Sequence, residues 1–277
     1  MNVTRRFLGA ALALSIGVAG ALPAAAQSTT QGLSSESVIE TIKERGVIKI
    51  GLSLFVPWSM RDLDGELIGF ELDVGRKLAE DMGVEVEFIP TSWDGIIPAL
   101  VAGNFDAIIS GMSVTASRNL TVNFTDPYAF SGLAVYSNIE MTKGMTRDDF
   151  NSSDIIFAAR RGATPATVIA KQFPEAQILL FDEDGAAAQE VLNGNAHATM
   201  AAQPTPNREV ANYPETLHIP FEALYDPRGE AFAIRKGDPD ALNYFNNWIA
   251  QQWRSGWLEE RHNYWFATND WADQVAQ

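Results

Sequence analysis

The chain has 277 residues, 46% of them hydrophobic, with 20 basic and 35 acidic side chains and a net charge of −15. This length and apolar content suffice for one large or two ordinary domains with packed cores. The acidic balance argues against nucleic acid or an anionic membrane surface as the main partner, because both need a basic face. The absence of cysteine excludes disulfides, thiolate metal sites and thiol-linked lipid anchors. We expect no metal and no cofactor.

Residues 1–26 have the pattern of a secretory signal peptide. Arg5 and Arg6 form a positive start, residues 7–22 are mostly apolar or small, and alanines 24–26 offer a cleavage site. Glycines interrupt the apolar run, which makes a membrane span the weaker alternative. The arginine pair is close to a twin-arginine signal, so the export route stays open. We expect a soluble periplasmic protein without a lipid anchor.

In the first half of the chain, hydrophobic periodicity predicts alternating helices and strands after a polar tether at 27–37. Apolar residues recur every four positions from Phe70 to Met82, on one helix face that ends at Gly83. The order of elements indicates right-handed crossovers and a mostly parallel sheet. Helices are expected over 38–45, 70–82 and 96–101, and strands over 47–51, 84–89 and 105–109.

The same alternation begins again after residue 130 and predicts a second α/β unit. The long helix that follows carries Trp248, Trp253 and Trp257 at a helical spacing typical of core packing. Two such units facing each other are the simplest architecture, since ligands of open α/β sheets bind beyond the carboxyl ends of the strands. Strands are expected over 133–136, 155–159, 178–181, 196–201 and 231–234, and helices over 164–173, 185–192 and 239–262.

Four stretches of the sequence resemble the family 3 extracellular solute-binding proteins, the polar amino-acid receptors of ABC importers. They are GVIKIGLSLFVPWSM (46–60), IGFELDVGRKLAEDMG (68–83), SWDGIIPALVAGNFDAIISGMSVTASRNLTVNFTDPY (92–128) and AFAIRKGD (231–238).

The resemblance implies an α/β fold of the two-lobed, type II periplasmic-binding-protein class, in which two hinge strands join lobes that close on a ligand. Lobe 1 is then 38–130 plus 231–270, lobe 2 is 131–230, and 271–277 form a tail. The implied function is capture of a small carboxylated solute, an amino acid or a derivative, for an ABC permease in the inner membrane. We expect a monomer.

Arg118 is the leading candidate for contact with the ligand. The resemblance places it, within GMSVTASR, where the family's arginine binds the ligand α-carboxylate. A planar guanidinium can donate two parallel hydrogen bonds to a carboxylate. Gly111 and Ser113 match positions that offer a backbone N–H and a hydroxyl to the same group. The alternatives are a surface arginine and ordinary turn chemistry.

Three aromatic residues fall at or beside positions where the family encloses the ligand side chain. They are Phe55, Trp58 and Trp93. Aromatic walls exclude water and so strengthen polar contacts inside a cleft. The alternative for each of them is core packing.

The loop that opens the first helix of lobe 2 supplies two more candidates. The resemblance implies that Thr164 donates to the ligand carboxylate, and a helix N-terminus favours anions. Arg160 stands where relatives carry a lysine or another polar contact. The alternative is a solvated surface arginine.

Lobe 2 departs from the family pattern in GNAHATMAAQP (194–204). The family usually has an aspartate shortly before this proline, which pairs with the ligand α-ammonium, whereas this chain has Ala202 and Gln203. The first binding loop lacks its usual aspartate as well. Because a buried ammonium without a counter-charge is costly, we expect a ligand with no primary α-ammonium, or with a methylated or acylated nitrogen. The alternative is that Asp182 or Glu183 supplies the acid.

Cyclohexadienyl dehydratases share this fold and are the enzyme alternative. PTSW at 90–93 and the tryptophan-rich C-terminal helix are similar to that group. Its acid–base glutamate in lobe 2 has no counterpart, because Thr205, Pro206 and Asn207 stand at that place. The sequence also lacks a nucleophile elbow and a phosphate-binding loop. We therefore expect a binding protein and no enzyme.

Overall fold

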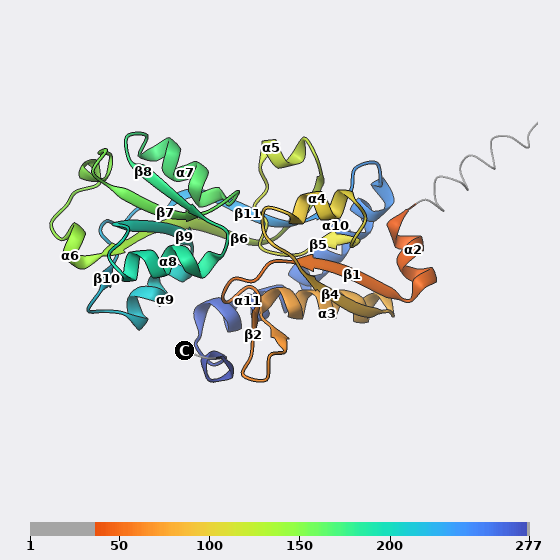
Figure 1. Ribbon diagram of the computed structural model, residues 1–277. Coiled ribbons are helices and arrows are strands. Elements are labelled where there is room, and N and C mark those ends of the chain that lie inside the picture. Colours follow the sequence, from red (N-terminus) through yellow and green to blue (C-terminus); the bar gives the residue numbers. More distant parts are fainter. Residues whose placement is uncertain (1–36, 276–277) are drawn as a thin grey trace, which may run out of the picture.

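A computed structural model describes residues 37–275 of the protein (Figure 1). The predicted signal peptide and almost all of the predicted tether lie outside these residues. Within the described range, no helix combines the length and the apolar character that crossing a membrane requires.

Nine strands of the described chain form one sheet that runs through both halves of the molecule (Figure 1). Its order is β4 (Glu85–Pro90), β1 (Val47–Leu52), β5 (Ala107–Ile108), β11 (Tyr225–Ile234), β6 (Asn123–Asn138), β9 (Ala198–Ala202), β7 (Ile156–Arg160) and β8 (Gln177–Phe181), with β10 (Leu217–His218) beside β6. A separate ladder pairs β2 (Met60–Arg61) with β3 (Leu67–Ile68).

The two ends of the sheet are parallel and its centre is antiparallel. In lobe 1, β1 pairs in parallel with β4 and β5, and in lobe 2 β7 pairs in parallel with β8 and β9. The long strands β6 and β11 pair antiparallel with each other and join the two lobes. The predicted parallel pairing thus holds within each lobe, but the sheet as a whole is mixed, because the chain crosses between the lobes and returns.

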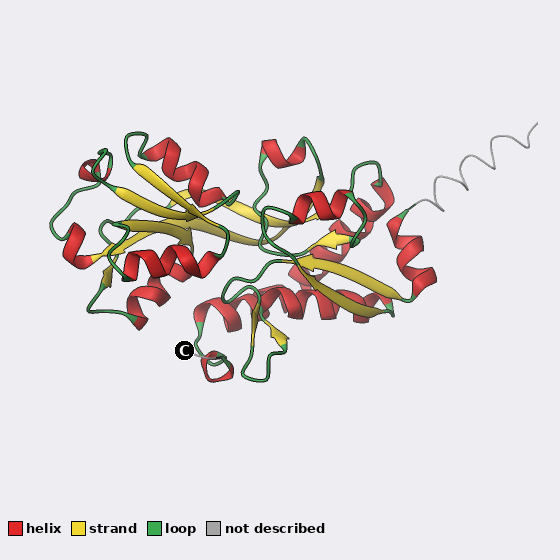
Figure 2. Ribbon diagram, in the orientation of Figure 1, coloured by secondary structure: helices red, strands yellow, loops and turns green. Residues whose placement is uncertain are grey.

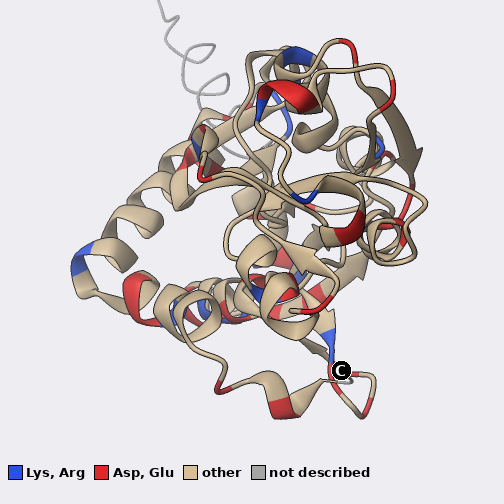
Figure 3. Cartoon of the chain, turned by 90° about the vertical axis from the view of Figure 1, so that its left-hand side faces the viewer, with Lys and Arg blue, Asp and Glu red and all other residues tan. Residues whose placement is uncertain are grey.

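Helices cover the strands of both lobes (Figure 2). Those of lobe 1 are α2 (Val38–Arg45), α3 (Phe70–Met82), α4 (Ile96–Val101), α5 (Ala116–Asn119), α10 (Pro239–Ser255) and α11 (Trp257–His262). Those of lobe 2 are α6 (Ile139–Thr142), α7 (Thr164–Gln172), α8 (Asp184–Leu192) and α9 (Thr205–Asn212). Short helical turns lie at Asp148–Phe150, Asn263–Ala267 and Ala272–Gln274. Acidic residues are spread over several helices and loops in the side view (Figure 3).

The predicted helices over 38–45, 70–82 and 96–101 are confirmed with the same bounds. The single helix predicted over 239–262 is wrong. It ends at Ser255, because Gly256 takes a left-handed φ of 79° there, and α11 begins directly after it.

Both hinge strands are longer than the apolar pattern indicates. The predicted strand 133–136 is one part of β6, and β11 begins at Tyr225 rather than at residue 231. Pro127 and Gly229 lie in the missed parts, and both residue types are unfavourable in strands. The lobe boundaries at 130/131 and 230/231 fall within these strands and stay a prediction.

Each lobe has its own hydrophobic core. In lobe 1, α3 and α10 bury Phe70, Phe245 and Trp248 against the sheet, which agrees with the core packing predicted for the tryptophan helix. In lobe 2, Phe157 and Phe173 stack with their ring centres 5.1 Å apart. Each core therefore supports the strand ends of its own lobe.

Both ends of the described chain are attached to lobe 1. Ser37 caps α2 and donates its hydroxyl to Asp238 at 2.9 Å. Trp271, within the predicted tail, is only 3% exposed and donates its indole N–H to the carbonyl of Trp265 at 3.0 Å. These residues belong to the packed lobe.

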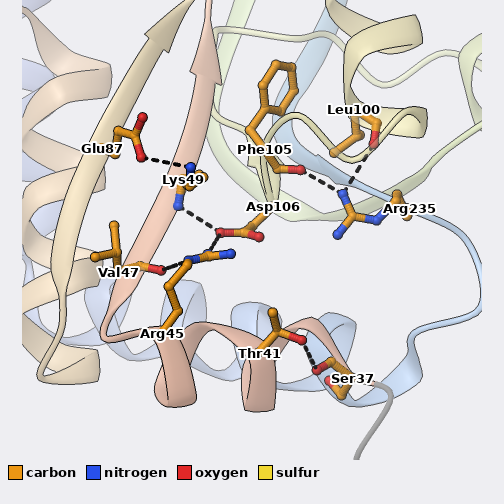
Figure 4. A network of polar contacts seen from close by, with 10 residues as sticks. All are labelled: Ser37, Thr41, Arg45, Val47, Lys49, Glu87, Leu100, Phe105, Asp106 and Arg235. Atoms are coloured by element: carbon orange, nitrogen blue, oxygen red, sulfur yellow. Dashed lines mark hydrogen bonds and ion pairs between the residues drawn. The ribbon is translucent and has the colours of Figure 1, made fainter.

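A buried aspartate joins α2 and β1 to the start of β5 (Figure 4). Asp106 is 5% exposed, accepts from Arg45 Nη2 at 2.5 Å and accepts the N–H of Lys49 at 2.7 Å. Arg235 donates to the carbonyls of Leu100 and Phe105 nearby. These bonds fix the alignment of β1 with β5, whose carboxyl ends lead to the site.

Candidate ligand-binding site

A cavity of about 1010 Å³ lies between the lobes. Loops that follow β1, β4, β5 and β7 contribute to its lining, so it lies at the carboxyl ends predicted from the α/β pattern. The strands β6 and β9 and the helices α8 and α9 also contribute to the lining. The volume is at the upper end of the range common for small-molecule sites. The sequence-predicted residues that line it are Phe55, Trp58, Trp93, Gly111, Ser113, Arg160, Thr164 and Ala202.

Phe55 and Trp58 form an aromatic wall on the lobe 1 side. Their rings stack with centres 5.5 Å apart, and Trp58 also meets the edge of Phe266 at 4.7 Å. Trp58 is 1% exposed, and its indole N–H has no hydrogen-bond partner. It is therefore a core residue and a wall of the cavity at once. Gly111 packs directly beside these rings. A β-carbon at this position would lie 2.9 Å from Phe55, so a larger residue would clash with the ring.

The backbone N–H of Gly111 is bonded inside the protein. It donates to Glu71 Oε1 at 2.6 Å and to the hydroxyl of Tyr128 at 3.0 Å. Glu71 is fully buried, and this burial raises its pKa to about 8, although hydrogen bonds from Tyr128 and Gly111 oppose the rise. A contact between the Gly111 N–H and a ligand carboxylate stays a prediction, and it requires exchange with Glu71.

Replacing Glu71 with glutamine should flatten the pH dependence of stability. The pKa of Glu71 is raised from 4.5 to about 8 in the folded protein, so the folded state binds its proton more tightly than the unfolded state. The free energy of unfolding should therefore fall as the pH rises from about 5 to about 8. Urea unfolding across this range measures the slope. Glu71→Gln should reduce the slope, and Glu66→Gln at an exposed position should keep it. An equal slope in all three proteins would contradict this assignment.

Arg118 lines a second cavity of about 580 Å³, which shares Trp93, Ala163 and Thr164 with the first. Its Nη1 donates to the carbonyl of Ser113 at 3.0 Å, and its Nη2 donates to the carbonyl of Gly162 at 3.3 Å. The guanidinium carbon lies 5.3 Å from the centre of the Trp93 ring. The structure therefore places Arg118 beside the larger cavity rather than in its lining.

Arg160 brings a second guanidinium to the same tryptophan. Its central carbon lies 5.5 Å from the ring centre of Trp93, and its Nη2 donates to Ser53 Oγ at 2.6 Å. Arg160 is 6% exposed and belongs to lobe 2, whereas Trp93 and Ser53 belong to lobe 1. Cationic groups from both lobes thus meet where the two cavities join.

Arg118 carries a positive charge that the surrounding protein leaves uncompensated. Burial and the neighbouring charge of Arg228 lower the pKa of Arg118 to about 10. Within residues 37–275, Arg118 forms no ion pair with an aspartate or a glutamate, and its side chain donates to the carbonyls of Ser113 and Gly162. An anionic group of a ligand would supply the missing counter-charge.

The two lobes contact each other around this junction. Arg118 reaches from lobe 1 to Gly162, and Arg160 reaches from lobe 2 to Ser53. Thr205 in α9 donates to the carbonyl of Val56 at 3.3 Å. Hydrogen bonds at several points therefore hold the lobes against each other.

Ala202 lies at the end of β9, pairs with Leu133 and faces the cavity without a charge. Gln203 does not line either cavity, and its N–H donates to the carbonyl of Gly132. Asp182 is 69% exposed and pairs with Arg161 at 2.9 Å, and Glu183 is an exposed residue of the cavity rim. None of these residues places a buried acid in the cavity.

A buried acid in the cavity comes instead from β11, where sequence analysis missed it. Glu230 lines the larger cavity and is 2% exposed. Its Oε1 accepts the hydroxyl of Ser131 at 2.6 Å, and its Oε2 has no hydrogen-bond partner among residues 37–275. The sequence signal was an acidic residue placed directly before the apolar run AFAI. No described group of acidic or histidine side chains could hold a metal ion.

The sequence matches the family described as bacterial extracellular solute-binding proteins, family 3, over residues 48–268. The chain belongs to this family. A solved structure of a putative ABC transporter binding component from Wolinella succinogenes, complexed with lysine, matches with a TM-score of 0.78. It is 34% identical, and the match covers 83% of this chain and 99% of that one. The predicted family and two-lobed fold are confirmed.

Curated relatives of this family 3 protein include both receptors and an enzyme. The L-cystine-binding protein TcyJ of Escherichia coli K12 is 26% identical over 243 residues, which cover 87% of this chain and 90% of the relative. The cyclohexadienyl dehydratase of Pseudomonas aeruginosa is 24% identical over 234 residues, covering 84% and 87%. The chain thus matches almost the full length of both proteins.

Proposed function

We propose that this family 3 protein captures a small carboxylated solute, an amino acid or an amino-acid derivative, in a periplasm and delivers it to the permease of an ABC importer. The observation that carries the proposal is the meeting of two guanidinium groups, one from each lobe, on Trp93 where the two cavities join. Such a junction suits a carboxylate, because guanidinium groups donate strong charge-assisted hydrogen bonds to carboxylate oxygens. Closure of the lobes would then enclose the ligand.

The rest of the cavity supports an amino-acid ligand. The ring wall of Phe55 and Trp58 offers an apolar surface for a side chain, and the volume accommodates an amino acid with a long side chain. One relative is an L-cystine-binding protein, and one similar solved structure is complexed with lysine. We further propose a monomer that is exported by its signal peptide and carries no lipid anchor, since the chain has no cysteine.

One observation favours an enzyme as the second candidate. Glu230 is a cavity-lining carboxyl whose pKa burial raises to about 7, a range suited to general acid–base catalysis. Against it, the lobe 2 position of the dehydratase glutamate carries Thr205, whose hydroxyl is bonded to the carbonyl of Val56. The binding function therefore has the stronger support.

A thermal-shift screen combined with a turnover assay separates the two functions. The screen contains amino acids, betaines, dicarboxylates and sulfonates, and the assay follows prephenate and arogenate for an aromatic product. A ligand at a hundred times its Kd should raise the free energy of unfolding by about 2.7 kcal/mol. We expect stabilisation by an amino acid and no aromatic product. Product formation at catalytic rates would favour the enzyme, and a screen without any stabilising amino acid would contradict the proposal.

A further inference from the structure

We propose that Glu230, on the hinge strand β11, binds the α-ammonium of the ligand in place of the acid that lobe 2 lacks. The inference rests on the proposed function of amino-acid capture. It assigns the α-ammonium, the second charged group of the ligand, to Glu230. This residue lies outside the two binding loops in which the family usually has an aspartate.

The hydrogen bonding of Glu230 leaves one carboxyl oxygen for a ligand. The Ser131 hydroxyl donates to Oε1 at 2.6 Å and so orients the carboxyl group. Oε2 is buried and has no hydrogen-bond partner in the described part of the chain, and Glu230 lines the larger cavity. A buried acceptor without a hydrogen bond costs free energy, which a donor on the ligand would recover.

The backbone places Glu230 next to the segment that positions Arg118. Glu230 and Ser113 form an isolated β-bridge, and both line the larger cavity. The carbonyl of Ser113 accepts the hydrogen bond from Arg118. Because the carboxylate and the ammonium of an α-amino acid are attached to one carbon, their protein partners must lie close together. The contacts of Ser113 bring the backbone of Glu230 and the side chain of Arg118 to the same segment.

Arg228 is the competing partner for the Glu230 carboxyl. It lies two residues away on β11, and its charge lowers the pKa of Glu230 in part. However, Arg228 pairs with Asp226 and lines the second cavity, and no hydrogen bond links it to Glu230. Burial dominates, and the pKa of Glu230 is raised to about 7. The carboxyl group thus remains available for a cation from the ligand.

The other acids near the cavity are less suited to this role. Asp182 is exposed and paired with Arg161, and Glu183 is exposed on the rim. Glu209 in α9 also lines the larger cavity, but it already pairs with Arg208 at 3.1 Å. A solvated carboxylate contributes little to an ion pair, whereas a buried carboxylate contributes more. With Glu230 as the anchor, a plain amino acid should bind more tightly than its N-acylated analogue. This expectation replaces the one drawn from the missing aspartate at Ala202.

Calorimetric titrations of Glu230→Gln test the assignment. The probes are L-lysine, L-arginine, L-cystine and L-glutamine, each compared with its Nα-acetyl derivative. For each plain amino acid that binds the wild type, the variant should raise Kd at least roughly thirtyfold, since it removes a buried charge pair. The Kd of the acetyl derivatives should stay within about twofold. Glu66→Gln makes the same chemical change at an exposed position outside both cavities and should leave every Kd unchanged.

The pH dependence of binding to the wild type is an independent test that needs no variant. Glu230 must be ionised to hold the ammonium, so Kd at pH 6 should be about tenfold higher than at pH 8. The groups that couple to it are Arg228 on β11, Glu71 on α3 and Tyr128 on β6. Glu230→Gln should remove the pH dependence, whereas a dependence that comes from Glu71 would persist.

The outcomes separate the inference from the proposed function. If none of the probes and no amino acid of the screen binds the wild type, the proposed function fails and the inference fails with it. If amino acids bind but neither Glu230→Gln nor pH alters their Kd, the inference alone is overturned. Aromatic product formation that Glu230→Gln abolishes would make the residue an acid–base group and would also overturn it.

Discussion

Replacing Arg118 with alanine should weaken amino-acid binding by about 2–5 kcal/mol, or roughly 30- to 5,000-fold in Kd. Burial and the neighbouring charge of Arg228 lower the pKa of Arg118, so the protein itself does not stabilise this half-buried charge well. A ligand carboxylate at the junction of the two cavities would gain most from it. The fold should persist, because the side-chain hydrogen bonds of Arg118 within residues 37–275 go to two loop carbonyls, those of Ser113 and Gly162.

Titration calorimetry with matched variants measures the effect. Arg118→Lys keeps the charge but cannot form the planar fork, so it should also lose affinity. Arg161→Ala removes an arginine that is half exposed and paired with Asp182, and it should leave Kd unchanged. The amino-acid amide, which lacks the carboxylate, should bind wild type and Arg118→Ala alike. An unchanged Kd for the amino acid in folded Arg118→Ala would remove this assignment.

Replacing Phe173 with alanine should lower the free energy of unfolding by about 3–5 kcal/mol, the usual cost of deleting a fully buried aromatic ring. Phe173 has no exposed surface and stacks on Phe157. Its ring centre lies 5.3 Å from the guanidinium carbon of Arg147. Its removal would leave a cavity in the core of lobe 2 at the end of α7.

Urea unfolding followed by circular dichroism measures this loss. Phe130→Ala provides the control, because the Phe130 side chain on β6 is 62% exposed. That variant should change the free energy of unfolding by less than about 0.5 kcal/mol. Equal losses of unfolding free energy in the two variants would show that Phe173 does not stabilise the lobe 2 core more than an exposed ring does.

The sequence predicted the lobes better than the strands that join them. Within a lobe, helices such as 70–82 show a clear apolar face and end at a glycine, so local periodicity is sufficient. In the hinge, Pro127 on β6 and Gly229 on β11 interrupt any strand pattern. The pairing of β6 with β11 overrides these local preferences, and pairing between distant segments is invisible in a single sequence.

Residues of the cavity lining were predictable where they belong to a local sequence motif. The family pattern indicated the loops of Trp93 and Ser113, and both residues line the cavity. It did not indicate that Glu71, distant in sequence, bonds to the N–H of Gly111. Glu230 has no motif at all, and only its burial and its unpartnered oxygen identify it. Such features depend on tertiary packing rather than on spacing.

The central claim is that one amino-acid molecule binds between the lobes and leaves unchanged. The most direct measurement is a calorimetric titration of the wild type with the amino acid that stabilises it most, followed by mass spectrometry of the recovered ligand. We predict one ligand per chain and recovery of the amino acid intact. The absence of saturable binding by every amino acid and derivative in the screen, or recovery of a converted product, would contradict the claim.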